Sequence, residues 1–291
     1  MRPIRFRACG VAVGLLALAT LLPAGRAMAE ATAGDRQAER AAALLDKLHT
    51  RDVAEAWRKM ILTSLPECGG DETTQSRTKT AWQTAIQTAF DVEKFYGDLH
   101  AAFTQSFTAG ELEQLLAFRN SLLGRKISLL EKPDTEGAQD AAAAMTKIGA
   151  MSRALKGDPA RRKVMEELVA ATGGVDALVD MLSNVSLGTS LGAAATTPAG
   201  QPRMTRGEIL DMVGAARPVL RQAVNPMIVP ATAMVYKALT IQELRHYRDM
   251  LVSPLGRKAS DIFLVALDKA MQAQAFAIGA RFAKELNTQD M

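Results

Sequence analysis

The chain has 291 residues, with 35 basic and 31 acidic side chains and few aromatic ones (5%). All of the basic excess lies in the first 29 residues; the remaining 262 residues carry 31 bases and 31 acids. That balance excludes the long-range attraction for nucleic acid or anionic lipid that a basic protein has. Plentiful Ala, Leu and Met with few aromatic residues favour helices over strands.

The N-terminus has the pattern of a secretory signal peptide. Three arginines within the first seven residues precede an apolar core at 11–22, and Ala27 and Ala29 form a small-x-small cleavage sequence. A membrane anchor is the alternative, but this core is shorter than the roughly 20 residues that cross a bilayer. We therefore expect residues 1–29 to be removed after Ala29, leaving a periplasmic or secreted chain without a transmembrane segment.

One cysteine, Cys68, remains after that cleavage, in a Pro- and Gly-containing stretch at 66–70. A single thiol cannot form an intrachain disulfide. The thiol is either an incidental free group, or one that reacts or pairs with another chain.

An internal repeat relates residues 108–128 to residues 240–260, at an offset of 132, with nine of 21 positions identical. A duplicated unit is the simplest explanation. Weaker similarity on both sides places one helical module at 35–157 and a second at 158–291. Gly157, Asp158 and Pro159 form a helix-ending signal at the boundary.

The repeated residues predict a tight helical hairpin. Thr and Glu three residues apart form a capping box at the start of its first helix, where a Leu begins the apolar face. A Ser caps the second helix, a Pro fits its first position, and a Gly allows the two helices to approach closely. These residues are Thr108, Glu111, Leu112, Ser121 and Gly124 in the first copy, and Thr240, Glu243, Leu244, Ser253, Pro254 and Gly256 in the second.

Residues 183–203 are rich in Gly, Ala, Ser and Thr, and this composition predicts a flexible surface loop inside the second module. No sustained period-two alternation predicts a strand. The expected fold class is therefore all-α, with two related helical-hairpin modules in a bundle-like arrangement.

This hairpin resembles the exported bacterial family called domain of unknown function twenty fifty-nine. The second copy carries the Thr-x-x-Glu-Leu start and the Ser-Pro-x-Gly-Arg-Lys turn in full. The first copy departs from the pattern at Leu122, where the family has Pro, and Arg119 and Leu251 stand where the family tends to have an aromatic residue. The resemblance implies an exported all-helical domain and implies no activity.

Catalytic and metal motifs have weak support. Residues 188–192 read Gly-x-Ser-x-Gly, but a nucleophile elbow needs a strand before the serine. The three histidines, His49, His100 and His246, have no metal-binding spacing, so we expect neither metal nor cofactor. Glu111 and Glu243 could be paired catalytic carboxylates, yet the capping box already explains them.

The recurring basic pairs, Arg125 with Lys126 and Arg257 with Lys258, leave two interpretations open. They could bind an anion near a helix N-terminus. Duplication alone could also preserve them, with their stems covering the hairpin.

These observations favour a non-enzymatic module that binds or scaffolds another protein of the cell envelope. The Ala- and Met-rich stretch at 262–286 could supply an adaptable surface for that partner. One alternative is a binder of small anions or envelope polymers through the Arg–Lys pairs, and another is an enzyme of unrecognised type. The oligomeric state is left open.

Overall fold

A computed structural model describes residues 33–63, 71–133, 141–198, 200–201 and 203–288. Within these ranges the chain is all-α, as predicted: twelve helices pack into a bundle and no strand occurs. The expected signal peptide and Cys68 lie outside the described residues. The helices are α1 (Ala33–Lys47), α2 (Thr50–Thr63), α3 (Glu72–Ala89), α4 (Val92–Ser106), α5 (Ala109–Asn120), α6 (Leu122–Leu130), α7 (Ala141–Lys156), α8 (Pro159–Ala171), α9 (Gly174–Thr196), α10 (Arg206–Val235), α11 (Ile241–Val252) and α12 (Pro254–Thr288).

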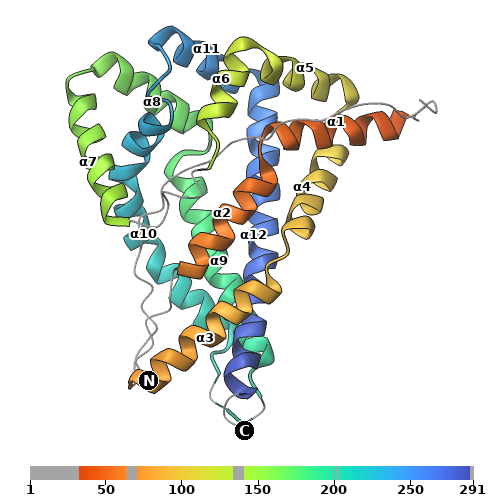
Figure 1. Cartoon of the computed structure of the whole chain (residues 1–291), viewed down its shortest axis with the longest axis vertical. Coiled ribbons are helices and arrows are strands. Elements are labelled where there is room, and N and C mark those ends of the chain that lie inside the picture. Colours follow the sequence, from red (N-terminus) through yellow and green to blue (C-terminus); the bar gives the residue numbers. More distant parts are fainter. Residues whose placement is uncertain (1–32, 64–70, 134–140, 199, 202, 289–291) are drawn as a thin grey trace.

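The longest helix, α12, runs through the length of the molecule, and α5, α6 and α11 gather around one end of it (Figure 1). By length and composition α12 could cross a membrane. Many of its apolar residues are instead packed against α9, α3 and α4, and Leu267 and Ile278 are fully buried there, whereas Val265 and Phe276 are 56% and 43% exposed. The helix is thus part of the protein core along one of its sides.

The last helix of each half packs on the other half. In the second half α12 packs on α3 and α4 of the first half, and in the first half α7 packs on α10 of the second. Within the halves, α1 packs on α4 and α5 just as α8 packs on α10 and α11. These contacts correspond when the chain is shifted by the repeat offset, so the two halves are intertwined.

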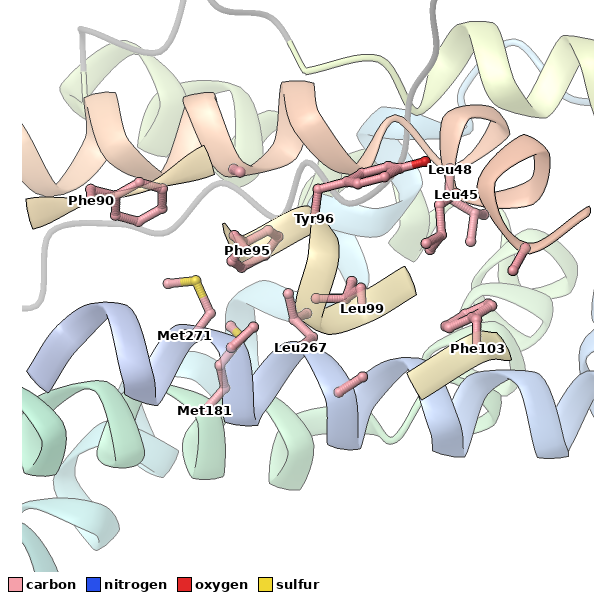
Figure 2. Packing of buried hydrophobic residues seen from close by; sticks show 14 of the residues in the cluster. Leu45, Leu48, Phe90, Phe95, Tyr96, Leu99, Phe103, Met181, Leu267 and Met271 are labelled. Atoms are coloured by element: carbon pink, nitrogen blue, oxygen red, sulfur yellow. The ribbon is translucent and has the colours of Figure 1, made fainter. Parts of the chain in front are cut away.

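Both hydrophobic cores therefore combine the halves. Figure 2 shows Leu99 of α4 between Leu45 of α1 and Leu267 of α12, with Phe95 of α4 nearer to Met271 of α12. The second core joins Ile127 of α6 to residues of α8, α10 and α11. The boundary signal at 157–159 does separate α7 from α8, but it does not separate two cores.

The flexible loop expected at 183–203 is wrong for most of its length, because α9 continues as a helix to Thr196. Its glycines allow α9 and α12 to touch backbone to backbone. A Cβ added at Gly192 would lie 2.0 Å from the carbonyl oxygen of Phe276, and one at Gly279 would lie 1.9 Å from that of Thr189. The small residues that resembled a linker thus form a close helix–helix interface.

Gly192→Ala should lower the free energy of unfolding by at least about 2 kcal/mol, because the new methyl group forces α9 away from α12. Gly214→Ala is the matched control: nothing lies within 4 Å of that position in α10, so alanine should be neutral or stabilise by up to about 1 kcal/mol. Urea unfolding of both variants measures the difference. Equal stabilities would contradict the close approach.

Candidate functional site

Both repeated hairpins have the local structure that their residues predict. Thr108 and Thr240 form capping boxes with Glu111 and Glu243, and each threonine N–H donates to its glutamate at 2.7 Å. The serines Ser121 and Ser253 accept the N–H of the glycine three residues later, at 3.0 Å in each copy.

The hairpin glycines are needed for close approach. A Cβ on Gly124 or Gly256 would lie 2.0 Å from a carbonyl oxygen of the preceding helix. The hairpin residues therefore have a clear structural role in both copies.

Two crossed ion pairs join the hairpins. Lys126 Nζ lies 2.8 Å from Glu243 Oε1, and Lys258 Nζ lies 2.6 Å from Glu111 Oε1. Each lysine of one copy thus binds the capping glutamate of the other. The lysine hydrogen bond, followed by the threonine N–H, lowers the pKa of both glutamates. The two lysines are consequently engaged within the protein.

The arginines of the basic pairs lie apart from these ion pairs. Arg125 is exposed and donates to the Asn120 carbonyl oxygen at 2.6 Å, and Arg257 is exposed as well. The structure therefore does not bring the four basic residues together as one group of free cations, although each pair keeps an exposed arginine.

A buried polar cluster, which the sequence analysis did not identify, lies between α5, α6, α10 and α11. Arg119 Nη1 donates to Glu131 Oε2 at 2.8 Å, and the hydroxyls of Tyr236 and Tyr247 donate to Glu131 Oε1 at 2.6 and 2.9 Å. Arg119 is 6% exposed and Glu131 is 1% exposed. Four polar side chains are thus paired inside an apolar core.

This cluster breaks the symmetry of the repeat. The positions equivalent to Arg119 and Glu131 in the second copy are Leu251 and Phe263. Both are apolar, so the second half has no such charge pair. A polar residue where the repeat has an apolar one was the sequence signal that could have identified the cluster.

Burial and mutual pairing set the protonation of the cluster. Burial raises the pKa of Glu131, while Arg119 and the two tyrosine hydroxyls oppose that rise. Burial also raises the pKa of Tyr236 and Tyr247 above that of free tyrosine. For Arg119 the burial penalty is outweighed by Glu131 and the tyrosines, so its pKa is raised and the guanidinium stays charged.

A cavity of about 360 Å³ lies beside the cluster and is lined mainly by apolar side chains from both halves of the chain. Arg119, Tyr236 and Tyr247 form part of its wall, whereas Glu131 is not among the residues that line it. Most of the remaining polar wall residues are already paired, as Asp268 is with Asn184 and Asp180 with Arg217. The cavity is therefore mainly apolar, and we call the part of its wall formed by Arg119, Tyr236 and Tyr247 its polar end.

His49 lies near this region in an unusual environment. Its side chain is buried, its backbone has a φ of +52°, and its Nδ1 lies 3.1 Å from Asp52 Oδ2. Its buried Nε2 has no partner among the described residues. Burial, together with the positive charges of Lys132 and Arg119, lowers the pKa of His49 to about 3, so the ring is neutral at pH 7.

The other candidate motifs are not brought together. The Gly-x-Ser-x-Gly stretch lies within α9, where Gly188 and Gly192 face α12. His100 Nε2 lies 2.9 Å from the Ala38 carbonyl oxygen, and His246 is exposed next to Phe118. In the part of the chain that the structure describes, no group of three or more His, Cys, Asp or Glu side chains could hold a metal ion.

Comparisons with protein-family models, curated proteins and solved structures find no match to this chain. The resemblance of the hairpins to the exported family therefore stays a prediction. The function must be argued from the cavity, the buried cluster and the surface.

We expect His49 to make the protein less stable as the pH falls. The pKa of the folded state is lowered relative to the unfolded value of about 6.5, so the unfolded chain binds the proton first. Between pH 6.5 and 5 this group should remove about 2 kcal/mol of stability, at about 1.4 kcal/mol per pH unit.

His49→Asn should remove most of that loss, because asparagine does not titrate and tolerates a positive φ. Urea unfolding at pH 7.5 and pH 5 measures the effect. The exposed His246→Asn variant is the control and should keep the wild-type difference. An unchanged pH dependence in His49→Asn would show that His49 is accessible to protons in the folded state.

Proposed function

We propose that this protein binds a small apolar molecule in its central cavity. The observation that carries the proposal is the cavity of about 360 Å³ with an almost continuous apolar wall. Small-molecule sites are typically concave, mainly apolar and between about 300 and 1,000 Å³, with a few polar groups that fix orientation. The cavity has the size and the chemistry of such a site.

An unfilled hollow of this size leaves the side chains that line it without packing partners on one side. Protein interiors are packed about as densely as organic crystals, and empty space forfeits dispersion contacts. The walls here come from helices of both halves, including Leu48, Phe103, Ile228 and Leu264. A ligand that fills the space would recover those contacts.

The cavity also reaches the surface. Two of its wall residues, Thr172 and Val265, are exposed, the latter by 56%. Thr172 ends α8, and the turn that follows lies against Leu264 of α12, because a Cβ on Gly173 would be 2.8 Å from Leu264 Cδ1. We expect a ligand to enter where the two exposed wall residues, Thr172 and Val265, lie.

Acid–base catalysis has less support from this geometry. Glu131 is the carboxyl group of the buried cluster, and it lies behind Arg119 and the two tyrosines rather than on the cavity wall. Its oxygens already accept three hydrogen bonds. The arrangement favours holding a ligand over transferring a proton to it.

Wild-type protein should bind N-phenyl-1-naphthylamine, an uncharged dye that fluoresces in apolar surroundings. Ala177→Leu with Ala259→Leu fills the cavity from α9 and α12 and should weaken dye binding at least tenfold while leaving stability equal or higher. Fluorescence titration and urea unfolding measure both effects.

Ala101→Leu, at an exposed position of α4, is the matched control and should bind the dye as wild type does. No dye binding by the wild type, or equal binding by the filled variant, would refute the proposal.

A protein-binding role is the second candidate, and one surface favours it. Leu122 and Leu129 of α6 are 83% and 76% exposed and lie seven residues apart, on one face of the helix. In-cell crosslinking should capture one discrete partner with wild type and lose it with Leu122→Glu and Leu129→Glu. The same captured species with wild type and variant would remove this surface as the binding site.

A further inference from the structure

The polar end of the cavity shows what kind of ligand it fits, and this inference rests on the ligand-binding function proposed above. Arg119, Tyr236 and Tyr247 reach the cavity wall, and all three bind the same carboxylate, Glu131. A ligand that fills the cavity meets these three side chains at one place and mainly apolar groups elsewhere.

The hydrogen bonds within the protein determine which donors of these three side chains remain for a ligand. Both tyrosine hydroxyl protons are donated to Glu131. Arg119 has five N–H donors, and among the described residues its hydrogen-bond acceptor is Glu131, through Nη1. Arg119 thus has N–H donors left over for a ligand, on a residue that is only 6% exposed.

The other polar wall residues have less to offer. The hydroxyls of Thr172 and Thr232 donate to carbonyl oxygens of their own helices. Asp268 accepts from Asn184, and Asp180 pairs with Arg217. Ser260 also lines the wall, but its hydroxyl is a single neutral donor. Arg119 is therefore the wall residue with the most N–H donors left for a ligand acceptor.

The charges of Arg119 and Glu131 favour an uncharged ligand acceptor over an anionic one. Arg119 and Glu131 together are neutral, and both are buried. A ligand carboxylate would place a second negative charge beside Glu131, with one guanidinium to compensate both, and burying an uncompensated charge is costly. An uncharged acceptor satisfies the guanidinium and adds no charge.

The rings around the polar end add a shape preference. Tyr247 stacks with Phe118 at a centroid distance of 6.2 Å and meets Tyr236 edge to face at 5.6 Å. All three rings line the cavity. Aromatic side chains pack well against flat, conjugated molecules.

The geometry points to a flat apolar ligand with one uncharged hydrogen-bond acceptor, such as a ketone, ester or amide carbonyl, which accepts from Arg119. The positions that carry this preference have apolar counterparts, Leu251 and Phe263, in the other half of the repeat. The charged residues of the polar end thus occur in one copy of the repeat and not in the other.

Three naphthalenes of similar size test this assignment by calorimetric or fluorescence titration at pH 8. They are 2-acetylnaphthalene, which has an uncharged acceptor; 2-isopropylnaphthalene, which has none; and 2-naphthoate, which is an anion. The ketone should bind at least about tenfold more tightly than both others, because hydrogen bonds to charged groups are strong.

Arg119→Met combined with Glu131→Gln removes the charge pair without leaving one partner unpaired. In this variant the preference for the ketone over the hydrocarbon should fall below about threefold, while hydrocarbon affinity is retained. The carbonyl stretching band of 2-acetylnaphthalene bound to wild type should also shift to lower frequency than in hydrocarbon solvent. This measurement needs no variant.

The outcomes separate the two proposals. Equal binding of ketone and hydrocarbon, or an unshifted carbonyl band, overturns the assigned ligand class while ligand binding in the cavity stands. Tightest binding of 2-naphthoate overturns it in favour of an anion. If neither these compounds nor N-phenyl-1-naphthylamine binds, the proposed function fails together with this inference.

Discussion

The backbone contact between α9 and α12 is the constraint on which the rest of the structure depends. Gly192 and Gly279 leave no room for a side chain at this contact, so the two helices have one close position relative to each other. Both then contribute to the cavity, α9 through residues such as Met181 and α12 through residues such as Phe263. Helices of the first half pack on the outer side of α12, so the contact sets the position of both halves.

Residues that the two copies share and residues in which they differ have different roles in the structure. The two crossed ion pairs use equivalent residues of the two copies, and so they join the halves symmetrically. They are Lys126 with Glu243 and Lys258 with Glu111. The buried charge pair exists on one side alone, which makes one end of the cavity polar. Replacing a buried ion pair by apolar residues often leaves stability unchanged or higher. Retention of the pair beside a cavity therefore agrees with a binding role.

Local structure could be predicted from the sequence, because capping boxes and hairpin glycines depend on residues a few positions apart. The contacts between residues far apart in the sequence could not be predicted. The stretch at 183–203 has the composition of a linker, and only the nearness of α12 makes its glycines helix-packing residues. The capping box already explained Glu243, so nothing in the sequence predicted that Glu243 also binds Lys126, 117 positions away. The buried cluster likewise combines side chains from four helices, so its hydrogen bonds could not be predicted from local patterns, and only the comparison of the two repeat copies points to Arg119 and Glu131.

The packing of α12 on the first half also bears on how the chain can fold. The core around α4 includes Leu267 and Met271 of α12, more than 160 positions further along the chain than α4. A growing chain must therefore have been synthesised as far as Met271 before that core can close. Such long-range closure slows folding, because the loop entropy is lost before the contacts form. Until α12 emerges, the faces of α3 and α4 that pack on it remain uncovered, and a chain shortened by this one helix would keep them exposed.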